Sequence, residues 1–75
     1  MGRAGRAPAP TVLRRLRGDE TQEEVAHRAE LTVSGYAKIE RGVTSPTWDT
    51  LLPIAAAHGL TMAELAAEVE RERAR

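Results

Sequence analysis

The sequence predicts an all-α fold, a compact bundle of five short helices, and three observations lead to this prediction. The chain has 75 residues and no cysteine, so neither a disulfide framework nor a thiolate zinc site can compensate for a small core. One Trp, one Tyr and no Phe accompany many Ala, Leu, Glu and Arg residues, a composition that favours helices over strands. A threonine that can cap a helix precedes each of five apolar segments, at Thr11, Thr21, Thr32, Thr47 and Thr61.

The first ten residues, MGRAGRAPAP, have no apolar periodicity and consist mostly of Gly, Pro and Ala. We expect residues 1–10 to be a disordered basic arm and residues 11–75 to be one domain. Two interpretations of Arg3 and Arg6 remain open. The arm either enters a minor groove of DNA or is a tail without a contact.

Each of the five segments has apolar residues at helical spacing and a signal at one or both of its ends. Thr21 and Thr61 are each followed three residues later by a glutamate, the pattern of a capping box. A glycine, which closes a last turn in the left-handed conformation, follows three segments, at Gly18, Gly42 and Gly59. The expected helices, with their core-facing residues, are 12–17 (Leu13, Leu16), 22–29 (Val25, Ala26, Ala29), 33–41 (Tyr36, Ile39), 48–58 (Trp48, Leu51, Leu52, Ala55) and 62–74 (Leu65, Val69).

Pro53 conflicts with the fourth of these helices. It has no N–H for the carbonyl of Asp49, and its ring crowds that carbonyl, at a cost of about 3 kcal/mol in a helix interior. A break at Pro53 would separate the apolar residues on its two sides. We therefore expect a helix with a kink or a tightened first turn.

Residues 22–41 have the pattern of two helices joined by a tight turn. The small Ala26 lets the second helix cross the first closely, Leu31 fills the turn, and Tyr36 and Ile39 face inward because they lie three residues apart. The outer face of the second helix then carries short side chains and one cation, and such a face fits a groove about 12 Å wide. These outer residues are Val33, Ser34, Ala37 and Lys38.

From Thr11 to Leu65 the sequence resembles the lambda-repressor-like, or XRE and Cro-type, helix-turn-helix regulators. The segments that carry the resemblance are Thr21-Gln-Glu-Glu-Val-Ala26, Ile39-Glu-Arg-Gly42, Pro46, Leu51-Leu52, Ala55, Gly59-Leu60-Thr61 and Glu64-Leu65. The resemblance implies a lambda-repressor-like domain that binds double-stranded DNA sequence-specifically in the major groove, as a transcriptional regulator and repressor.

The resemblance also implies roles for individual residues. The base-facing positions of the family correspond to Val33, Ser34, Ala37 and Lys38. The positions that contact phosphates correspond to Thr21, Gln22, Thr32, Arg41 and Thr44. Because Val33 and Ala37 cannot hydrogen-bond a base edge, part of the specificity is expected to come from DNA shape.

Glu40 resembles an acidic residue that pairs with an arginine at the end of the first helix, for which Arg17 is the first choice and Arg15 the second. Two positions depart from the family pattern. Glu30 occupies a turn position that usually carries a left-handed glycine, at a cost of about 1 kcal/mol or with a different bend of the turn. Glu20 replaces an apolar residue, so one core contact is missing.

Other function classes find less support. Eleven basic and eleven acidic residues give no net charge, so a protein-interaction module, or the antitoxin of a toxin–antitoxin pair, is the alternative to DNA binding. We find no catalytic constellation, no cofactor motif and no third metal ligand beside His27 and Glu30.

Tyr36 and Trp48 are expected to pack in the core. No apolar stretch approaches the roughly 20 residues that cross a bilayer, so the protein is expected to be cytoplasmic, without a membrane partner.

We expect a homodimer on an inverted-repeat operator, because one recognition helix buries too little surface for tight, specific binding. The expected interface is an apolar stripe on the last helix, although this stripe could instead serve only to close the core. Its residues are Met62, Leu65, Ala66 and Val69, with Leu60 nearby.

Overall fold

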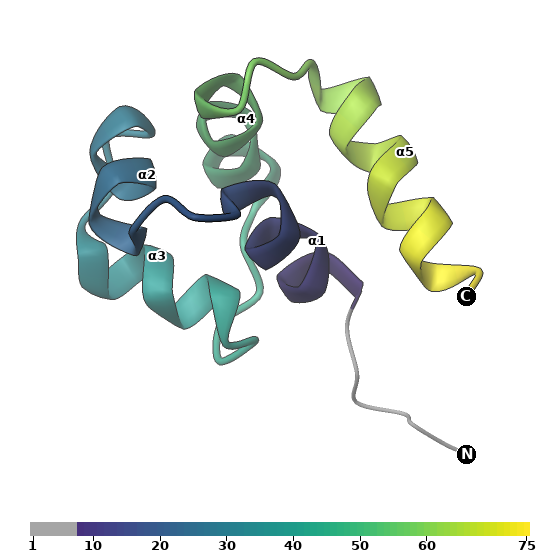
Figure 1. Cartoon of the computed structure of the whole chain (residues 1–75), viewed down its shortest axis with the longest axis horizontal. Helices are drawn as coiled ribbons and strands as arrows, with labels where there is room; N and C mark the ends of the chain where they lie inside the picture. The colour runs from purple at the N-terminus through teal and green to yellow at the C-terminus, as the bar shows by residue number, and fades with distance from the viewer. Residues whose placement is uncertain (1–7) are drawn as a thin grey trace.

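The computed structural model describes residues 8–75, and its five helices confirm the all-α bundle. In chain order they are α1 (Pro8–Arg17), α2 (Gln22–Arg28), α3 (Val33–Glu40), α4 (Trp48–Ala57) and α5 (Met62–Arg73) (Figure 1). The helices α2 to α5 begin at the expected residues and end one residue earlier than expected.

The beginning of α1 differs from the expectation. The helix starts at Pro8, so Thr11 lies inside it and does not cap it. Proline is tolerated in a first helical turn, where its missing N–H would have no partner in any case, so Pro8 and Pro10 fit the helix rather than exclude it. Of the arm expected over residues 1–10, residues 1–7 lie outside the described part of the chain.

Threonine caps start the other four helices, as predicted. The hydroxyl of each accepts a hydrogen bond from the N–H three residues later, at Thr21, Thr32, Thr47 and Thr61. Both capping boxes are present: the side chains of Glu24 and Glu64 accept from the N–H of Thr21 and Thr61, each at 2.8 Å. Gly18, Gly42 and Gly59 have positive φ angles of 56°, 75° and 72°, as helix-ending glycines should.

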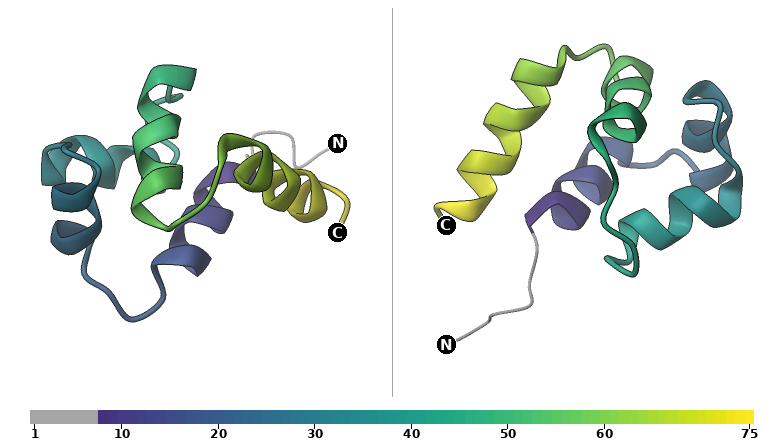
Figure 2. Two further views of the ribbon diagram at one scale, coloured as in Figure 1. Left: turned by 90° about the horizontal axis from the view of Figure 1, so that it is seen from above. Right: turned by 180° about the vertical axis from the view of Figure 1, so that it is seen from behind.

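The core lies where α1 is packed between α3 and α5 (Figure 1), while α2 packs on α3 and α4. Figure 2 shows the same arrangement from above and from behind. The largest fully buried apolar side chains are Tyr36, Leu13, Ile54, Leu65, Val12 and Val25. Tyr36 is therefore a core residue, as expected.

The prediction that Trp48 and Leu52 face the core is wrong. Their exposed fractions are 62% and 42%, and α4 presents Ile54 and Ala55 to the core instead, with Leu51 beside them. Leu51, Ile54 and Ala55 follow one another at spacings of three and one, which defines one helix face. Trp48 and Leu52 lie one turn apart beyond the edge of this face.

The helix α4 continues through Pro53. In its first turn the carbonyl of Thr47 accepts from the N–H of Thr50 at 3.1 Å and from the N–H of Leu51 at 3.0 Å, so an i to i+3 contact is added to the regular i to i+4 bond. The carbonyl that Pro53 leaves without a donor belongs to Asp49, which is exposed, so water can bind it.

Within residues 8–75, no single helix is long and apolar enough to cross a membrane. Taken together, α4 and α5 have the length and the apolar composition of a membrane-crossing segment, but the pair is bent by 97° at its junction.

Candidate nucleic-acid interface

A tight turn holds α2 and α3 together. The N–H of Leu31 donates to the carbonyl of Ala26 at 2.8 Å, which closes the end of α2. Glu30 adopts φ 60°, so the chain accepts the left-handed strain at this position rather than bending the turn another way. At the start of α3, a Cβ on Gly35 would lie 3.0 Å from the Thr32 hydroxyl, so the absence of a side chain at Gly35 leaves room for this cap.

The outer face of α3 presents three of the four predicted base-facing residues to solvent. Val33, Ser34 and Lys38 are exposed. Ala37 is only 9% exposed and lies at the edge of the core. Among the described residues, the side chain of Lys38 has no hydrogen-bond or ion-pair partner, so its ammonium group is available to a ligand.

The predicted phosphate-contacting residues lie at the two ends of α3. Thr32 caps its beginning, and the exposed Arg41 caps its end, with Thr44 exposed in the following loop. The start of α2 reaches the end of α3, because the amide Nε2 of Gln22 donates to Glu40 at 3.0 Å. Thr21 precedes Gln22 as the cap of α2, and its hydroxyl accepts from the N–H of Glu24.

Glu40, which is 1% exposed, fixes the orientation of this unit. The guanidinium of Arg17 donates to its carboxylate through Nε at 2.6 Å and through a second nitrogen at 3.1 Å. The hydroxyl of Tyr36 donates to the same carboxylate at 2.7 Å, and Gln22 completes the set. One buried carboxylate thus joins α1, α2 and α3.

The charge of Glu40 is stabilised in this environment. Burial alone would raise the pKa of its carboxyl group, but the hydrogen bonds from Arg17, Gln22 and Tyr36 outweigh burial and hold the pKa below its usual value. Burial, together with the bond to Glu40, raises the pKa of the Tyr36 hydroxyl. Tyr36 therefore remains a donor and Glu40 an acceptor near neutral pH.

Arg17, the first choice from the sequence, is confirmed as the partner of Glu40. Arg15 instead pairs with Glu72 at 2.8 Å and with Glu68 at 3.6 Å, and so connects α1 to α5. Sequence analysis missed Arg14, whose guanidinium donates to the backbone carbonyl of Glu40 at 2.7 Å. Arg14 and Arg17 are three residues apart on α1, a spacing that could have indicated a shared target.

Glu20, at the position where the sequence lacks an expected apolar residue, makes a polar contact instead. Its carboxylate accepts two hydrogen bonds from Arg28, at 2.6 and 2.9 Å. Arg28 also donates to the carbonyl of Ala57 at 3.0 Å. The link before α2 is therefore tied to α2 and α4 through Arg28.

In the described part of the chain, no group of three or more acidic, histidine or cysteine side chains forms a metal site.

The chain matches a known protein family. Residues 11–69 match the family described as "Helix-turn-helix domain". The chain matches no curated protein and no solved structure.

Proposed function

The chain belongs to the helix-turn-helix domain family, in its XRE and Cro-like group, and from this premise we propose that it is a sequence-specific transcriptional regulator. Helix-turn-helix domains bind DNA and are not enzymes. The proposal is that α3 enters the major groove and reads base edges there.

The observation that carries this proposal is the contrast between the two faces of α3. Its inner face is fixed by the buried Tyr36 and Glu40, whereas its outer face has short side chains and one cation without an intramolecular partner in residues 8–75. A rigid helix with a low, open face can approach base edges closely without first breaking contacts of its own.

The outer residues divide by chemistry. Lys38 can donate to the O6 and N7 acceptors of guanine, and Ser34 can donate or accept. Val33 can contact thymine methyl groups only, and Ala37, which is 9% exposed, offers little surface to a base. Thr21, Gln22, Thr32, Arg41 and Thr44 would contact phosphates on either side of the groove and set the register of the helix.

We propose that two copies bind an inverted-repeat operator as a homodimer. One α3 helix offers too few contacts for tight, specific binding, and a two-fold pair presents two such helices about one turn of DNA apart. A regulator of this kind acts as a repressor in the cytoplasm when its operator overlaps a promoter.

The proposal can be tested by selecting duplexes from a random-sequence library and measuring affinity over a salt series. The expected result is an enriched inverted repeat, bound at least about a thousandfold more tightly than unrelated DNA, with an affinity that falls as salt rises. If the chain enriches no sequence and binds no duplex at low salt, the proposal is wrong. A protein that copurifies with the chain would then favour the interaction-module function.

A further inference from the structure

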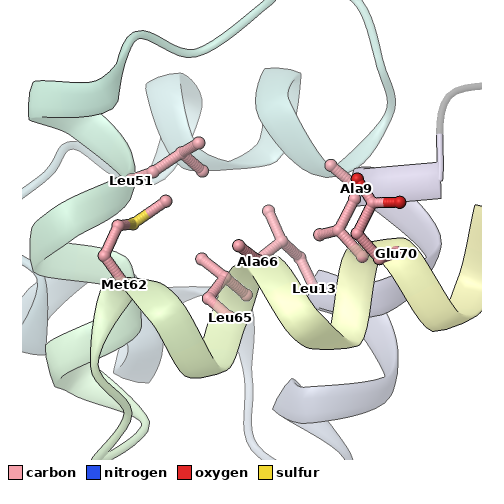
Figure 3. A pocket seen from close by; sticks show the side chains of 8 residues that line it. Ala9, Leu13, Leu51, Met62, Leu65, Ala66 and Glu70 are labelled. Carbon is pink, nitrogen blue, oxygen red and sulfur yellow. The ribbon is translucent and has the colours of Figure 1, made fainter.

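Two neighbouring hollows lie where α5 faces α1, α4 and the loop before α4. The first has a volume of about 170 Å³ and is lined by apolar side chains and by Glu70 (Figure 3). The second has a volume of about 290 Å³ and is lined in part by the α3–α4 loop and by Arg73. Ala9, Leu51 and Val69 line both hollows, so the two adjoin. We call them together the α5 groove.

The first hollow has room for one apolar group of limited size. One wall is the α5 stripe that the sequence indicated as an interface: Leu65 is buried, and Met62 and Val69 pack against the core. Leu13 and Leu51 line the hollow as well. An apolar cavity of about 150 Å³ in a protein core can bind benzene. A hollow of about 170 Å³ therefore fits a group of that size.

The polar groups along the rest of the groove are available to a ligand. The hydroxyls of Thr44 and Ser45 line the second hollow and have no hydrogen-bond partner within residues 8–75. The guanidinium of Arg73 lies 3.9 Å from the carboxylate of Glu70, which is too long for a hydrogen bond. Both side chains are mostly exposed, so this ion pair contributes little to stability and can be exchanged for contacts with a ligand.

We propose that the α5 groove binds a free α-amino acid whose apolar side chain is about as large as benzene. The side chain of the ligand occupies the first hollow, and its ammonium group pairs with Glu70. Its carboxylate pairs with Arg73 and accepts from the hydroxyls of Thr44 and Ser45. The two charged residues lie three apart on α5, so they face the two charges of one ligand from the same side of the helix.

The two charges favour an amino acid over simpler apolar ligands. A carboxylic acid without an ammonium group would bring a second negative charge beside Glu70, and an amine without a carboxylate would bring a second positive charge beside Arg73. A neutral hydrocarbon would leave the hydroxyls and the ion pair unused. A zwitterion satisfies both charges, and a pocket of this kind owes its specificity to a few polar groups at the edge of an apolar hollow.

An occupied groove affects DNA binding through Thr44. This step rests on the proposed function, in which Thr44 contacts a phosphate. A ligand carboxylate that accepts from the Thr44 hydroxyl takes that donor away from the phosphate and places a negative charge beside it. The bound amino acid therefore weakens the affinity for the operator.

Calorimetric titration of the free chain tests the ligand. The probes are L-phenylalanine and L-leucine, with 3-phenylpropanoate, which lacks the ammonium group, and 2-phenylethylamine, which lacks the carboxylate. We expect at least one of the amino acids to bind with a dissociation constant in the millimolar range or below, and both analogues to bind at least about fivefold more weakly than L-phenylalanine. Equal binding of L-phenylalanine and its two analogues, or no binding of either amino acid at millimolar concentration, would overturn the inference.

Charge variants test the two polar contacts separately. Arg73→Gln should weaken the binding of the amino acid and should not weaken that of 2-phenylethylamine. Glu70→Gln should weaken the binding of the amino acid and should not weaken that of 3-phenylpropanoate. Arg71→Gln, which changes an exposed arginine of α5 that does not line the groove, should leave all affinities unchanged. An equal effect of Arg71→Gln and Arg73→Gln would mean that general charge, not the groove, determines binding.

Two further variants place a ring on α5 inside and outside the groove. Ala66 lines the first hollow, so Ala66→Phe should fill it and abolish binding. Ala67 is exposed and does not line the groove, so Ala67→Phe should bind the amino acid as the unmodified chain does. Binding that weakens as the concentration of the unmodified chain rises would mean that a second copy occupies the hollow, and would overturn the inference.

The effect on DNA is measured with the selected operator. Saturating amino acid should weaken operator binding by at least about threefold in the unmodified chain and should have no effect on Ala66→Phe. An unchanged operator affinity with the ligand bound would overturn the coupling through Thr44. If the chain binds no duplex, the proposed function fails, whereas the titrations of the free chain still decide whether the groove binds an amino acid.

Discussion

The guanidinium of Arg17 reaches across from α1 and donates two hydrogen bonds to the carboxylate of Glu40, the last residue of α3. A charge as deeply buried as Glu40 is stable only when it is paired and hydrogen-bonded, so this contact fixes the proposed recognition helix relative to the rest of the domain. The geometry of the proposed DNA-binding face therefore depends on a residue that does not itself lie on that face.

The first prediction concerns this pair. Replacing Arg17 by Met or Glu40 by Gln should each lower the free energy of unfolding by roughly 2–4 kcal/mol, because either change leaves buried polar groups without a partner. A double-mutant cycle from denaturant unfolding should give a coupling energy above about 1 kcal/mol.

The control for this cycle is Arg15→Met combined with Glu40→Gln. Arg15 contacts α5 and not Glu40, so its effect should add to that of Glu40→Gln without coupling. Coupling of Glu40 to Arg15 but not to Arg17 would contradict the observed register of α1.

The second prediction concerns pH. The Nε2 atom of His58 is buried without a hydrogen-bond partner among the described residues, and burial, followed by the positive charge of Arg28, lowers the pKa of its imidazole. The unfolded chain therefore takes up a proton at a higher pH than the folded chain does. The contribution of neutral His58 to the free energy of unfolding should be fully present above about pH 7. It should decrease as the pH drops below about 6.5 toward the lowered pKa.

Thermal unfolding between pH 5 and 8 measures this effect. His58→Gln should flatten the decline in stability below pH 7, whereas His27→Gln, which changes an exposed histidine, should keep the decline of the unmodified chain. Equal slopes for the unmodified chain and His58→Gln would rule out His58 as the cause.

The third prediction concerns the turn between α2 and α3. Glu30 has a left-handed backbone, which costs a residue with a Cβ roughly 1–2 kcal/mol. Glu30→Gly should therefore raise the stability by about 1 kcal/mol and the Tm by roughly 4–8 °C. Glu30→Ala removes the same carboxylate but keeps the strain, so it should not stabilise; an equal gain in both variants would show that charge, not backbone conformation, sets the cost.

Local signals made most of the fold predictable. The four threonine caps and the helix-ending glycines act through hydrogen bonds and φ angles within a few residues, so the starts of α2 to α5 follow from sequence alone. The start of α1 does not follow from the sequence alone, because the Pro- and Gly-rich stretch before Thr11 is typical of disorder, whereas Pro8 and Pro10 fit a first helical turn. Trp48 was misplaced because helical spacing leaves the edge of an apolar face uncertain by one side chain.

The candidate site was predictable only in part. The resemblance supplied Glu40 and its partner Arg17, and both were correct. The contacts of Arg14 and Gln22 with Glu40 depend on how α1, α2 and α3 meet in space, and no sequence spacing across three helices encodes that arrangement. The exposure of Trp48 and Leu52 likewise follows from which neighbours α4 acquires.

The central claim is that α3 reads base edges, and two cations on this segment allow a direct test. Lys38 lies on the outer face of α3, and Arg41 caps its end. Both are exposed and carry the same charge, so a general attraction to DNA would make their alanine variants behave alike.

The decisive measurement is the affinity of Lys38→Ala and Arg41→Ala for the selected operator and for operators with single base changes, over a salt series. Lys38→Ala should weaken binding to the operator by about 1–3 kcal/mol and relax the preference at one or two base positions. Arg41→Ala should weaken binding to all sequences alike and reduce the salt slope by roughly one per subunit. If Lys38→Ala changes only the salt slope and leaves every base preference intact, Lys38 contacts phosphate and the account of how α3 reads the groove is wrong.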